Sequence, residues 1–509
     1  MVIGGTVMLL LTVFSARYSV EKPAWGSAQI AWDTPLFHVM FAALSLGFAY
    51  LLGQHPGRKD RRFMRRLTGI LAVGVTALLF WLITCANAVP QADQEQVYWA
   101  TRHLLEGNYS AISNNEYYQI YPFQLPLAQL QAWLFSLPGT DVVSGYRLTQ
   151  YLNALLSGAT FYLGGCITDE LFANSRVQVC YLLTALPFLP LYIYALFQYG
   201  DAPGVFFCVL SVYLYLRAER ERGVKRAACW IGNGLALTLV YLIRSALLTV
   251  WIAMFMIIVI NALRTRRVVP IAWFAGILAI CVLGQGLVWS SITQKTGIDK
   301  NEGEPLILCV AMGMQGSAEI SENPGSYNGY NWDTFRALGK DREMATRQAY
   351  TDMREKFSEW EENPGAMAQF YKSKLFCQWL EPSCSAFSST NKMDHEADWV
   401  TQLWFGKAQE RVYGFLNLYQ TFVYLLLAVY FLAFLKNPRT NALLPGLILV
   451  GGFLLSIVWE SQSRYTYPYL SFALPGAACG MNVCLKGIGQ MIQKARNHAV
   501  RRVQNRKAE

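Results

Sequence analysis

The sequence predicts an all-α protein that crosses a membrane about twelve times. Hydrophobic residues make up 54% of the 509 residues, and charged residues only 15%. A soluble domain carries about 25% charged residues, so this chain has too few polar side chains to cover several water-facing domains. The apolar residues also fall into long stretches separated by short basic runs. These observations exclude soluble, disordered and fibrous proteins.

Twelve apolar stretches are candidate membrane-spanning helices, since a crossing takes about 20 apolar residues. The first and the seventh stretch are short. The first has neither a basic region nor a small-residue cleavage signal, so we expect an anchor rather than a cleaved signal peptide. The candidate spans are 2–17, 34–53, 67–87, 146–167, 176–197, 202–217, 228–243, 245–263, 268–290, 413–435, 441–459 and 466–485.

Basic residues indicate how these spans are oriented. The net charge is +10, but Lys and Arg lie in short runs between apolar stretches, which does not favour a nucleic-acid partner. With the N-terminus in the cytoplasm, every basic run falls on the cytoplasmic side, as the positive-inside rule requires. We therefore expect a multi-pass plasma-membrane protein with both termini inside. The predicted inner segments are 54–66, 217–227, 264–267, 436–439 and 486–509, and the predicted outer segments are 18–33, 88–145, 198–201, 291–412 and 460–465.

Two outer segments contain helical patterns. Within 88–145, the stretches 94–105 and 125–137 predict short helices on the membrane surface. Within 291–412, helical stretches near 342–360 and 366–379 predict a small, mainly helical outer domain. The chain thus divides into two N-terminal helices with a basic loop, a transmembrane module containing the first outer loop, the outer domain, C-terminal helices and a basic tail. The corresponding boundaries are 1–66, 67–290, 291–412, 413–485 and 486–509.

Ionisable side chains at the outer ends of the spans are candidate functional groups, because charge close to hydrocarbon is costly. Asp93 and Glu95 follow the third span, and Asp201 lies in an outer turn. Each of these acids also has a structural explanation at the start of a helix. Arg244 lies between two apolar stretches with no other charge nearby. Arg244 could extend its side chain to the membrane–water interface, which would explain the isolated charge. We favour instead an interaction of Arg244 with a bound anion.

The strongest cluster is Glu460 with Arg464 and Tyr465, before the last span. Glu460 and Arg464 are four residues apart and can pair on a helical turn. Alternatively, they hold a polar headgroup, since Arg464 can donate two hydrogen bonds to a phosphate. Outer carboxylates and arginines together provide a proton acceptor and a cation for a departing phosphate. We therefore expect a transferase that uses a lipid-phosphate donor, with these groups around one cavity where the outer leaflet meets water.

Four stretches, in order, resemble the C-type (GT-C) superfamily of integral membrane glycosyltransferases. The resemblance is to the bacterial branch related to protein O-mannosyltransferases and lipid A aminoarabinose transferase. The stretches cover the predicted transmembrane core. They are Asp93-Gln-Glu95 continuing to Tyr121-Pro122, then Tyr199-Gly-Asp201-Ala-Pro203, then Leu242-Ile-Arg244-Ser, and finally Glu460-Ser-Gln-Ser-Arg464-Tyr465 with Pro468.

The resemblance implies transfer of a sugar from a polyprenyl-phosphate donor to a lipid, glycan or protein acceptor of the cell envelope, with inversion at the anomeric carbon. It makes Asp93 the base or a metal-site residue. Many relatives have adjacent Asp-Glu where this chain has Asp93-Gln94-Glu95, so Glu95 stays a candidate, and a divalent metal ion stays an open question. The expected catalytic residues are Asp93, Glu95 and Asp201, and the expected substrate-binding residues are Arg244, Glu460, Arg464, Tyr465 and Tyr121.

Two other functions fit parts of the pattern. A lipid-linked glycan polymerase or ligase would share the apolar core and the outer arginines, but would depend less on Asp93. A secondary transporter would place charges near the bilayer midplane, in interrupted helices. Two minor features are also open: Cys377 and Cys384 could form a disulfide, and the acidic run 394–398 is more typical of a solvated loop than of a metal site.

Overall fold

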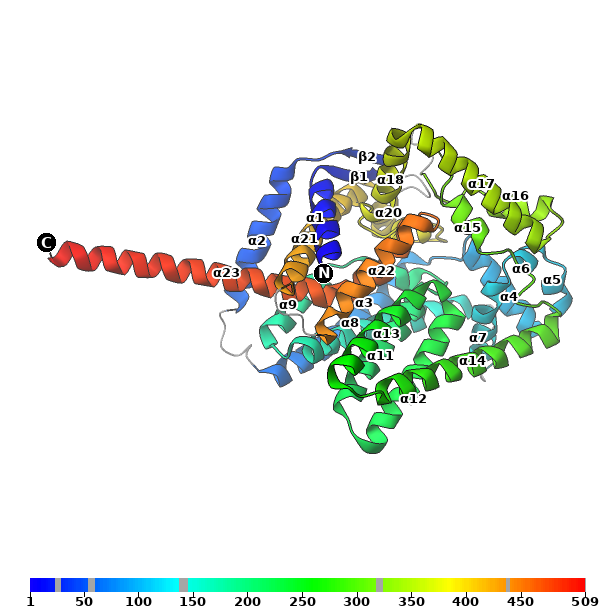
Figure 1. The fold of residues 1–509 in the computed structure, drawn as a ribbon, viewed down its shortest axis with the longest axis horizontal. Helices are drawn as coiled ribbons and strands as arrows, with labels where there is room; N and C mark the ends of the chain where they lie inside the picture. Colours follow the sequence, from blue (N-terminus) through cyan, green and yellow to red (C-terminus); the bar gives the residue numbers. More distant parts are fainter. Residues whose placement is uncertain (23–28, 54–59, 137–144, 317–323, 436–439, 509) are drawn as a thin grey trace.

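The computed structural model describes residues 1–22, 29–53, 60–136, 145–316, 324–435 and 440–508. Figure 1 shows a chain that is almost entirely helical in these ranges, with one antiparallel hairpin of two strands. Eight of the described helices are long and apolar enough to cross a membrane, and a bent helix pair would make a ninth span. The chain is therefore an all-α polytopic membrane protein. The predicted segment 436–439 and residues 54–59, with Arg58 and Lys59, lie outside the described ranges.

All twelve predicted stretches are helical, but only some qualify as spans. The qualifying helices, two of them preceded by a short 3-10 turn, are α2 (Pro35–Gly53), α3 (Arg61–Ala86), α11 (Asp201–Arg220), α12 (Gly223–Ile243), η5 (Ser245–Leu248) with α13 (Thr249–Thr265), α14 (Val269–Thr296), α21 (Lys407–Ala433), and η6 (Asn441–Leu443) with α22 (Leu444–Val458).

The remaining four stretches differ from simple spans in identifiable ways. Helix α1 (Val2–Ser15) has only 14 residues. Helix α8 (Gly145–Phe172) is long but contains buried polar residues, and α23 (Thr466–Ala508) runs on into the basic tail. Helix α9 (Ser175–Ala185) and the segment formed by α10 (Pro190–Ile193) and η4 (Tyr194–Leu196) meet at 67°. Pro187 and Pro190 lie at this break, where proline removes a backbone donor and interrupts the helix.

Helices α8, α11, α21 and α23 form the centre of the bundle. Helix α8 packs against α3, α9 and α11, while α21 packs against α1 and α23. At one end of α8, the buried carboxylates of Asp169 and Glu170 form ion pairs with arginines of α3 and α11. The pairs are Arg61–Asp169 at 2.6 Å, Arg65–Asp169 at 3.1 Å, Arg217–Glu170 at 3.4 Å and Arg220–Glu170 at 2.6 Å. Part of two predicted basic runs therefore holds helices together.

A hairpin replaces the plain loop that the sequence predicted at 18–33. Its strands are β1 (Tyr18–Lys22) and β2 (Gln29–Trp32). The Asn417 side chain of α21 binds both backbone groups of Val20, accepting from its N–H at 3.4 Å and donating to its carbonyl at 3.3 Å. This side-chain contact fixes the hairpin to the bundle.

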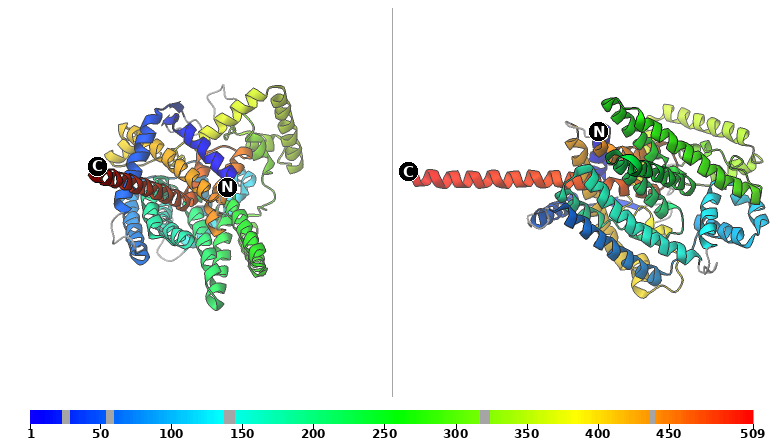
Figure 2. Two further views of the ribbon diagram at one scale, coloured as in Figure 1. Left: turned by 60° about the vertical axis from the view of Figure 1, so that its left-hand side comes forward. Right: turned by 90° about the horizontal axis from the view of Figure 1, so that it is seen from below.

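The helices predicted within 88–145 and 291–412 are present, and the names first outer segment and outer domain are kept for these two regions. The first outer segment contains α4 (Asp93–Glu106), α5 (Tyr109–Ser113), α6 (Glu116–Ile120), η2 (Pro122–Gln124) and α7 (Leu125–Phe135). The second contains α15 (Ile307–Met312), α16 (Tyr330–Ala337), α17 (Arg342–Glu362), α18 (Pro364–Trp379), α19 (Ala386–Ser389) and α20 (Asp398–Phe405). Helices α15 to α18 lie together beside the bundle, next to α4 to α6 (Figure 1). The opposite end of the molecule carries the projecting part of α23 (Figure 2).

Candidate functional site

The first element of the site is a buried ion pair between two helix ends. Asp201 opens α11 and its side chain is fully buried, while Arg244 follows the last residue of α12. Arg244 Nη2 lies 3.2 Å from Asp201 Oδ1, with 10% of the arginine side chain exposed. Gly200 permits this approach, because a Cβ there would lie 2.5 Å from the Ile243 carbonyl oxygen.

A second guanidinium joins this pair from the other end of the chain. Arg464 lies in the turn η7 (Ser463–Tyr465), immediately before α23, and is 6% exposed. Its guanidinium carbon lies 5.4 Å from the ring centre of Tyr199, and that of Arg244 is also 5.4 Å from the same ring. Both guanidinium groups contact the Tyr465 ring as well, at 5.6 Å from Arg244 and 5.8 Å from Arg464. Two arginines separated by 220 positions thus share two aromatic rings.

Several polar atoms in this cluster have no hydrogen-bond partner among the described residues. They include both carboxylate oxygens of Asp201 and Nε of Arg464. Burial lowers the pKa of the Arg464 guanidinium, but the combined effect of Asp201, Tyr465, Tyr199 and Asp93 outweighs burial, so the pKa lies above its usual value. Buried polar atoms normally have partners, and an exception calls for an explanation such as a bound group. Arg464 Nε can therefore donate a hydrogen bond to a ligand, whereas the Asp201 oxygens can only accept one.

Asp93 faces the same cluster from the first outer segment. It is the first residue of α4, where the helix dipole favours a carboxylate. The Tyr117 hydroxyl donates to Asp93 Oδ1 at 2.9 Å. Burial and the charge of Asp93 raise the pKa of Tyr117, so the phenol stays protonated. The preceding residue, Ala92, has φ 49°, an uncommon conformation for a residue with a Cβ. Such strain is often found at functional positions.

Glu460 completes the cluster and lies next to Arg464 and Arg244. The Tyr465 hydroxyl donates to Glu460 Oε1. Burial raises the pKa of Glu460, and the Asp93 carboxylate adds to that effect, while both arginines oppose it. Electrostatic interactions thus connect Arg464 with Asp93, Asp201 and Tyr465. They also connect Glu460 with Asp93, Arg244 and Arg464.

Buried amides position the loop that carries Tyr199 and Asp201. Gln150 of α8 donates to the Leu196 carbonyl at 3.0 Å, and Asn153 donates to the Phe197 carbonyl at 2.9 Å. From α4, Gln94 Oε1 accepts from the backbone N–H of Gln198 at 2.8 Å. Because Gln94 directly follows Asp93, this bond also fixes α4 relative to the loop. The uncharged middle residue of Asp93-Gln94-Glu95 thus connects two parts of the site.

The outer domain holds the loop that contains Glu460. Lys374 of α18 is fully buried and donates to the carbonyls of Gly313 at 2.6 Å and Ile457 at 3.1 Å. Burial lowers the pKa of this lysine to about 8, with nearby Glu460 opposing the shift. A Cβ on Gly313 would lie 2.8 Å from the Trp459 backbone. The outer domain and the Glu460 loop are therefore packed backbone to backbone.

Tyr121 lies between the first outer segment and the outer domain. Its ring centre is 5.1 Å from that of Tyr117, and its hydroxyl accepts from Asn331 Nδ2 at 3.2 Å. Asn331 also donates to both carboxylate oxygens of Glu304, at 3.1 and 2.9 Å. Burial raises the pKa of Glu304 to about 7. Tyr121 is thus connected to the site through the ring of Tyr117. Glu304 is a separate buried carboxyl group, linked to Tyr121 through Asn331.

The other predicted groups lie elsewhere. Glu95 points away from the cluster, with 44% of its side chain exposed, and lies 3.7 Å from Lys392. Cys377 and Cys384 are not joined by a disulfide. His395 is 93% exposed beside Asp394. Within the described ranges, no group of three or more His, Cys, Asp or Glu residues is placed to hold a metal ion.

Sequence reasoning missed Tyr117 and the positioning amides Gln94, Gln150 and Asn153. A polar amide inside an otherwise apolar helix was the available signal for Gln150 and Asn153. Tyr117 had no such signal, because tyrosines are common at membrane interfaces.

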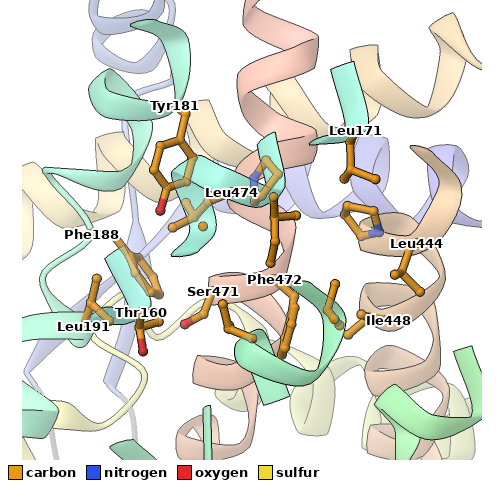
Figure 3. A pocket seen from close by; sticks show the side chains of 16 residues that line it. Thr160, Leu171, Tyr181, Phe188, Leu191, Leu444, Ile448, Ser471, Phe472 and Leu474 are labelled. Carbon is orange, nitrogen blue, oxygen red and sulfur yellow. The ribbon is translucent and has the colours of Figure 1, made fainter. Parts of the chain in front are cut away.

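A small apolar pocket, with a cavity of about 20 Å³, lies inside the bundle. Figure 3 shows Phe188 and Leu191 on one side, Leu444 and Ile448 on the other, and Ser471 and Phe472 of α23 between them. The pocket is lined by Thr160, Gly164, Ile167, Leu171, Tyr181, Phe188, Leu191, Val209, Val212, Leu444, Pro445, Ile448, Ser471, Phe472, Leu474 and Pro475. None of the six clustered side chains named above lines it, so the pocket and the cluster are neighbouring but distinct features.

The described structure therefore contains a buried cluster of acids and arginines next to an apolar pocket. Comparison with known proteins gives no family, since no protein-family model matches the chain and no curated protein is similar to it.

Proposed function

We propose that this protein is a membrane glycosyltransferase of the GT-C type. It would move a sugar from a polyprenyl-phosphate donor to an acceptor of the cell envelope, on the extracytoplasmic face of the plasma membrane. The observation that carries the proposal is the convergence of Arg244 and Arg464 on Tyr199 and Tyr465, beside Asp93 and Asp201. A phosphate placed between two buried guanidinium groups would receive charge-assisted hydrogen bonds from both.

The apolar pocket has a cavity of only about 20 Å³, so it would take the first part of a hydrocarbon tail only after its walls move apart. Val209 and Val212 lie 8 and 11 positions after Asp201 on α11, and Ser471 lies 7 positions after Arg464. At about 1.5 Å per residue, the pocket begins about 10 to 16 Å from the charged cluster, along both helices. A lipid phosphate held by the arginines would therefore extend its chain toward this pocket.

The reaction assigns a role to each charged group. Asp93 accepts the proton of the acceptor hydroxyl, whose oxygen attacks the anomeric carbon as the bond from that carbon to the phosphate oxygen breaks. The electron pair leaves with the polyprenyl phosphate, and Arg244 and Arg464 offset the growing negative charge. Tyr117 holds the Asp93 carboxylate in place. Attack from the face opposite the departing phosphate inverts the anomeric carbon.

The proposal includes twelve crossings with both termini in the cytoplasm. Helices α8 and α23 are less apolar than ordinary spans, but other helices surround them. Buried polar residues such as Gln150 and Asn153 therefore meet protein rather than lipid. Helix α1 and the bent pair of α9 and α10 would be the other two crossings.

The broken helix gives a secondary transporter some support, since transporters often bind substrates at such breaks. However, the break contains Leu186, Pro187, Phe188 and Leu189, with no charge or polar side chain to bind an ion. Phe188 faces the apolar pocket instead. The break is better explained as one wall of a lipid-tail site.

Sugar transfer by the purified protein tests the proposal. The protein in nanodiscs is incubated with a panel of radiolabelled polyprenyl-phosphate hexoses and envelope acceptors. Transfer is expected from at least one donor, with near-complete loss in Asp93→Asn and most activity kept in Glu95→Gln, a matched exposed carboxylate. Substantial transfer by Asp93→Asn would favour a polymerase or ligase. Absence of transfer together with counterflow in proteoliposomes would favour a transporter.

A further inference from the structure

The C-terminal part of α23 extends beyond the rest of the molecule (Figures 1 and 2). The first part of the helix packs against α9, α21 and α22. Every side chain from Gln490 to Val500 is exposed. A Cβ on Gly489 would lie 3.7 Å from the ring of Tyr50, in the last turn of α2, which ends at Gly53. The projecting segment therefore begins at the level where a membrane-spanning helix ends.

This segment carries positive charge only. Between positions 486 and 508 the sequence has seven basic residues and no acidic residue. Further exposed arginines lie at the start of α3, which follows α2 in the sequence, including Arg62 and Arg66. The seven basic residues are Lys486, Lys494, Arg496, Arg501, Arg502, Arg506 and Lys507.

The segment also has an apolar face. Ile488, Met491, Ile492, Ala495 and Ala499 recur at spacings of three and four, which puts them on one side of a helix. Met491 and Ile492 are 63% and 49% exposed, so the fold of this chain leaves that side uncovered. A helix with one basic and one apolar face is typical of binding at a lipid interface.

A second copy of the chain fits this face less well than a lipid surface does. Paired helices usually place opposite charges beside the apolar seam. Here all the charges are positive, so two copies would repel each other. Ala495 and Ala499 would also give a coiled-coil seam little apolar area. Anionic headgroups complement the charge, and their acyl chains accept Met491 and Ile492.

The segment has a place to bend toward such a surface. Gly487 and Gly489 lie where the packed part of α23 gives way to the projecting part. Glycine weakens a helix by about 1 kcal/mol relative to alanine, and helices bend at such positions. A Cβ on Gly487 would have no neighbour within 4 Å, so nothing packs against the helix at that point.

We propose that residues 490–508 form a surface helix that binds the anionic lipid headgroups of the adjacent leaflet, with Met491, Ile492 and Ala495 turned into the interface. This binding site is separate from the charged cluster and does not depend on the glycosyltransferase proposal.

A fluorescent amino acid in place of Met491 of the full-length protein tests the inference. The protein is placed in nanodiscs of phosphatidylcholine, alone or mixed with phosphatidylglycerol. In the anionic nanodiscs, we expect blue-shifted emission and protection from an aqueous quencher, both reversed by high salt. Each basic residue near an anionic surface contributes about a fivefold factor in binding. The triple variant Lys494→Gln, Arg496→Gln, Arg501→Gln should therefore lower the equilibrium constant for binding at the interface about 100-fold.

The matched control removes three exposed arginines of the outer domain, through Arg336→Gln, Arg347→Gln and Arg354→Gln. This variant should keep the blue shift. The inference is overturned if the probe is equally exposed in both lipids, or if the projecting-helix triple variant behaves like the control. It is also overturned if probes on two copies transfer energy to each other regardless of lipid charge, which would identify a second copy as the partner.

Discussion

Replacing Arg464 with alanine should weaken donor binding strongly while leaving the helices in place. The guanidinium is 6% exposed, close to Asp201, and its Nε has no hydrogen-bond partner in the described structure. Removing one partner of a buried charge contact typically costs about 2 to 5 kcal/mol in binding. A phosphate must compete with Asp201 for this arginine, so we expect the loss of binding free energy to lie at the lower end of this range. About 2 kcal/mol corresponds to a roughly 30-fold higher Kd for the lipid phosphate.

Binding of polyprenyl phosphate to nanodisc-embedded protein, measured by tryptophan fluorescence or calorimetry, checks this value. Arg464→Lys keeps the charge but loses the paired donors, so its Kd should rise less, by about tenfold. Arg347→Ala removes an arginine that is 77% exposed and should leave Kd unchanged. If Arg464→Ala binds the lipid phosphate as tightly as the unaltered protein, the assignment of the phosphate site is refuted.

Three further predictions follow from contacts in the same structure. Tyr117→Phe removes the hydrogen bond to Asp93 and should slow transfer about five- to tenfold, since such a bond contributes about 1 kcal/mol; an unchanged kcat would show that Tyr117 does not position the base. Glu304 has its pKa raised to about 7 by burial, so the native state binds the extra proton between pH 4.5 and 7. Stability should therefore fall by about 3 kcal/mol as pH rises through that window, and Glu304→Gln should flatten the Tm–pH curve. Asp169→Asn breaks the contacts to Arg61 and Arg65. It should lower the unfolding free energy by about 1 to 3 kcal/mol, because both arginines are partly exposed. The substitution Glu362→Gln, at an exposed carboxylate at the end of α17, should have little effect on the unfolding free energy.

Much of the helical architecture was predictable because a helix that contacts lipid must consist mainly of apolar residues, which are visible in the sequence. Helices α3, α13 and α14 match predicted spans closely. The number of membrane-spanning helices was harder to predict where a helix contacts protein instead of lipid, because a helix surrounded by other helices tolerates polar residues. Helix α8, with Gln150 and Asn153, is such a case. The hairpin was not predictable, because its link to Asn417 joins positions 397 residues apart.

The charged cluster was predictable in part for a similar reason. Asp201, Arg244 and Arg464 stood out because isolated charges beside apolar stretches are costly. Choosing between Asp93 and Glu95 required the direction of α4, which turns Asp93 toward Tyr117 and Glu95 toward Lys392. No pattern around Lys374 indicated that this lysine of the outer domain would hold the Glu460 loop. That contact depends on the close packing of Gly313 against Trp459.

Determining the structure with polyprenyl phosphate bound in a lipid nanodisc tests the central claim most directly. We expect a phosphate within hydrogen-bond distance of both Arg244 and Arg464, near Asp93, with the hydrocarbon chain directed toward Phe188 and Phe472. A phosphate bound at another surface, with the Asp201–Arg244 contact undisturbed and Arg464 Nε still without a partner, would contradict it.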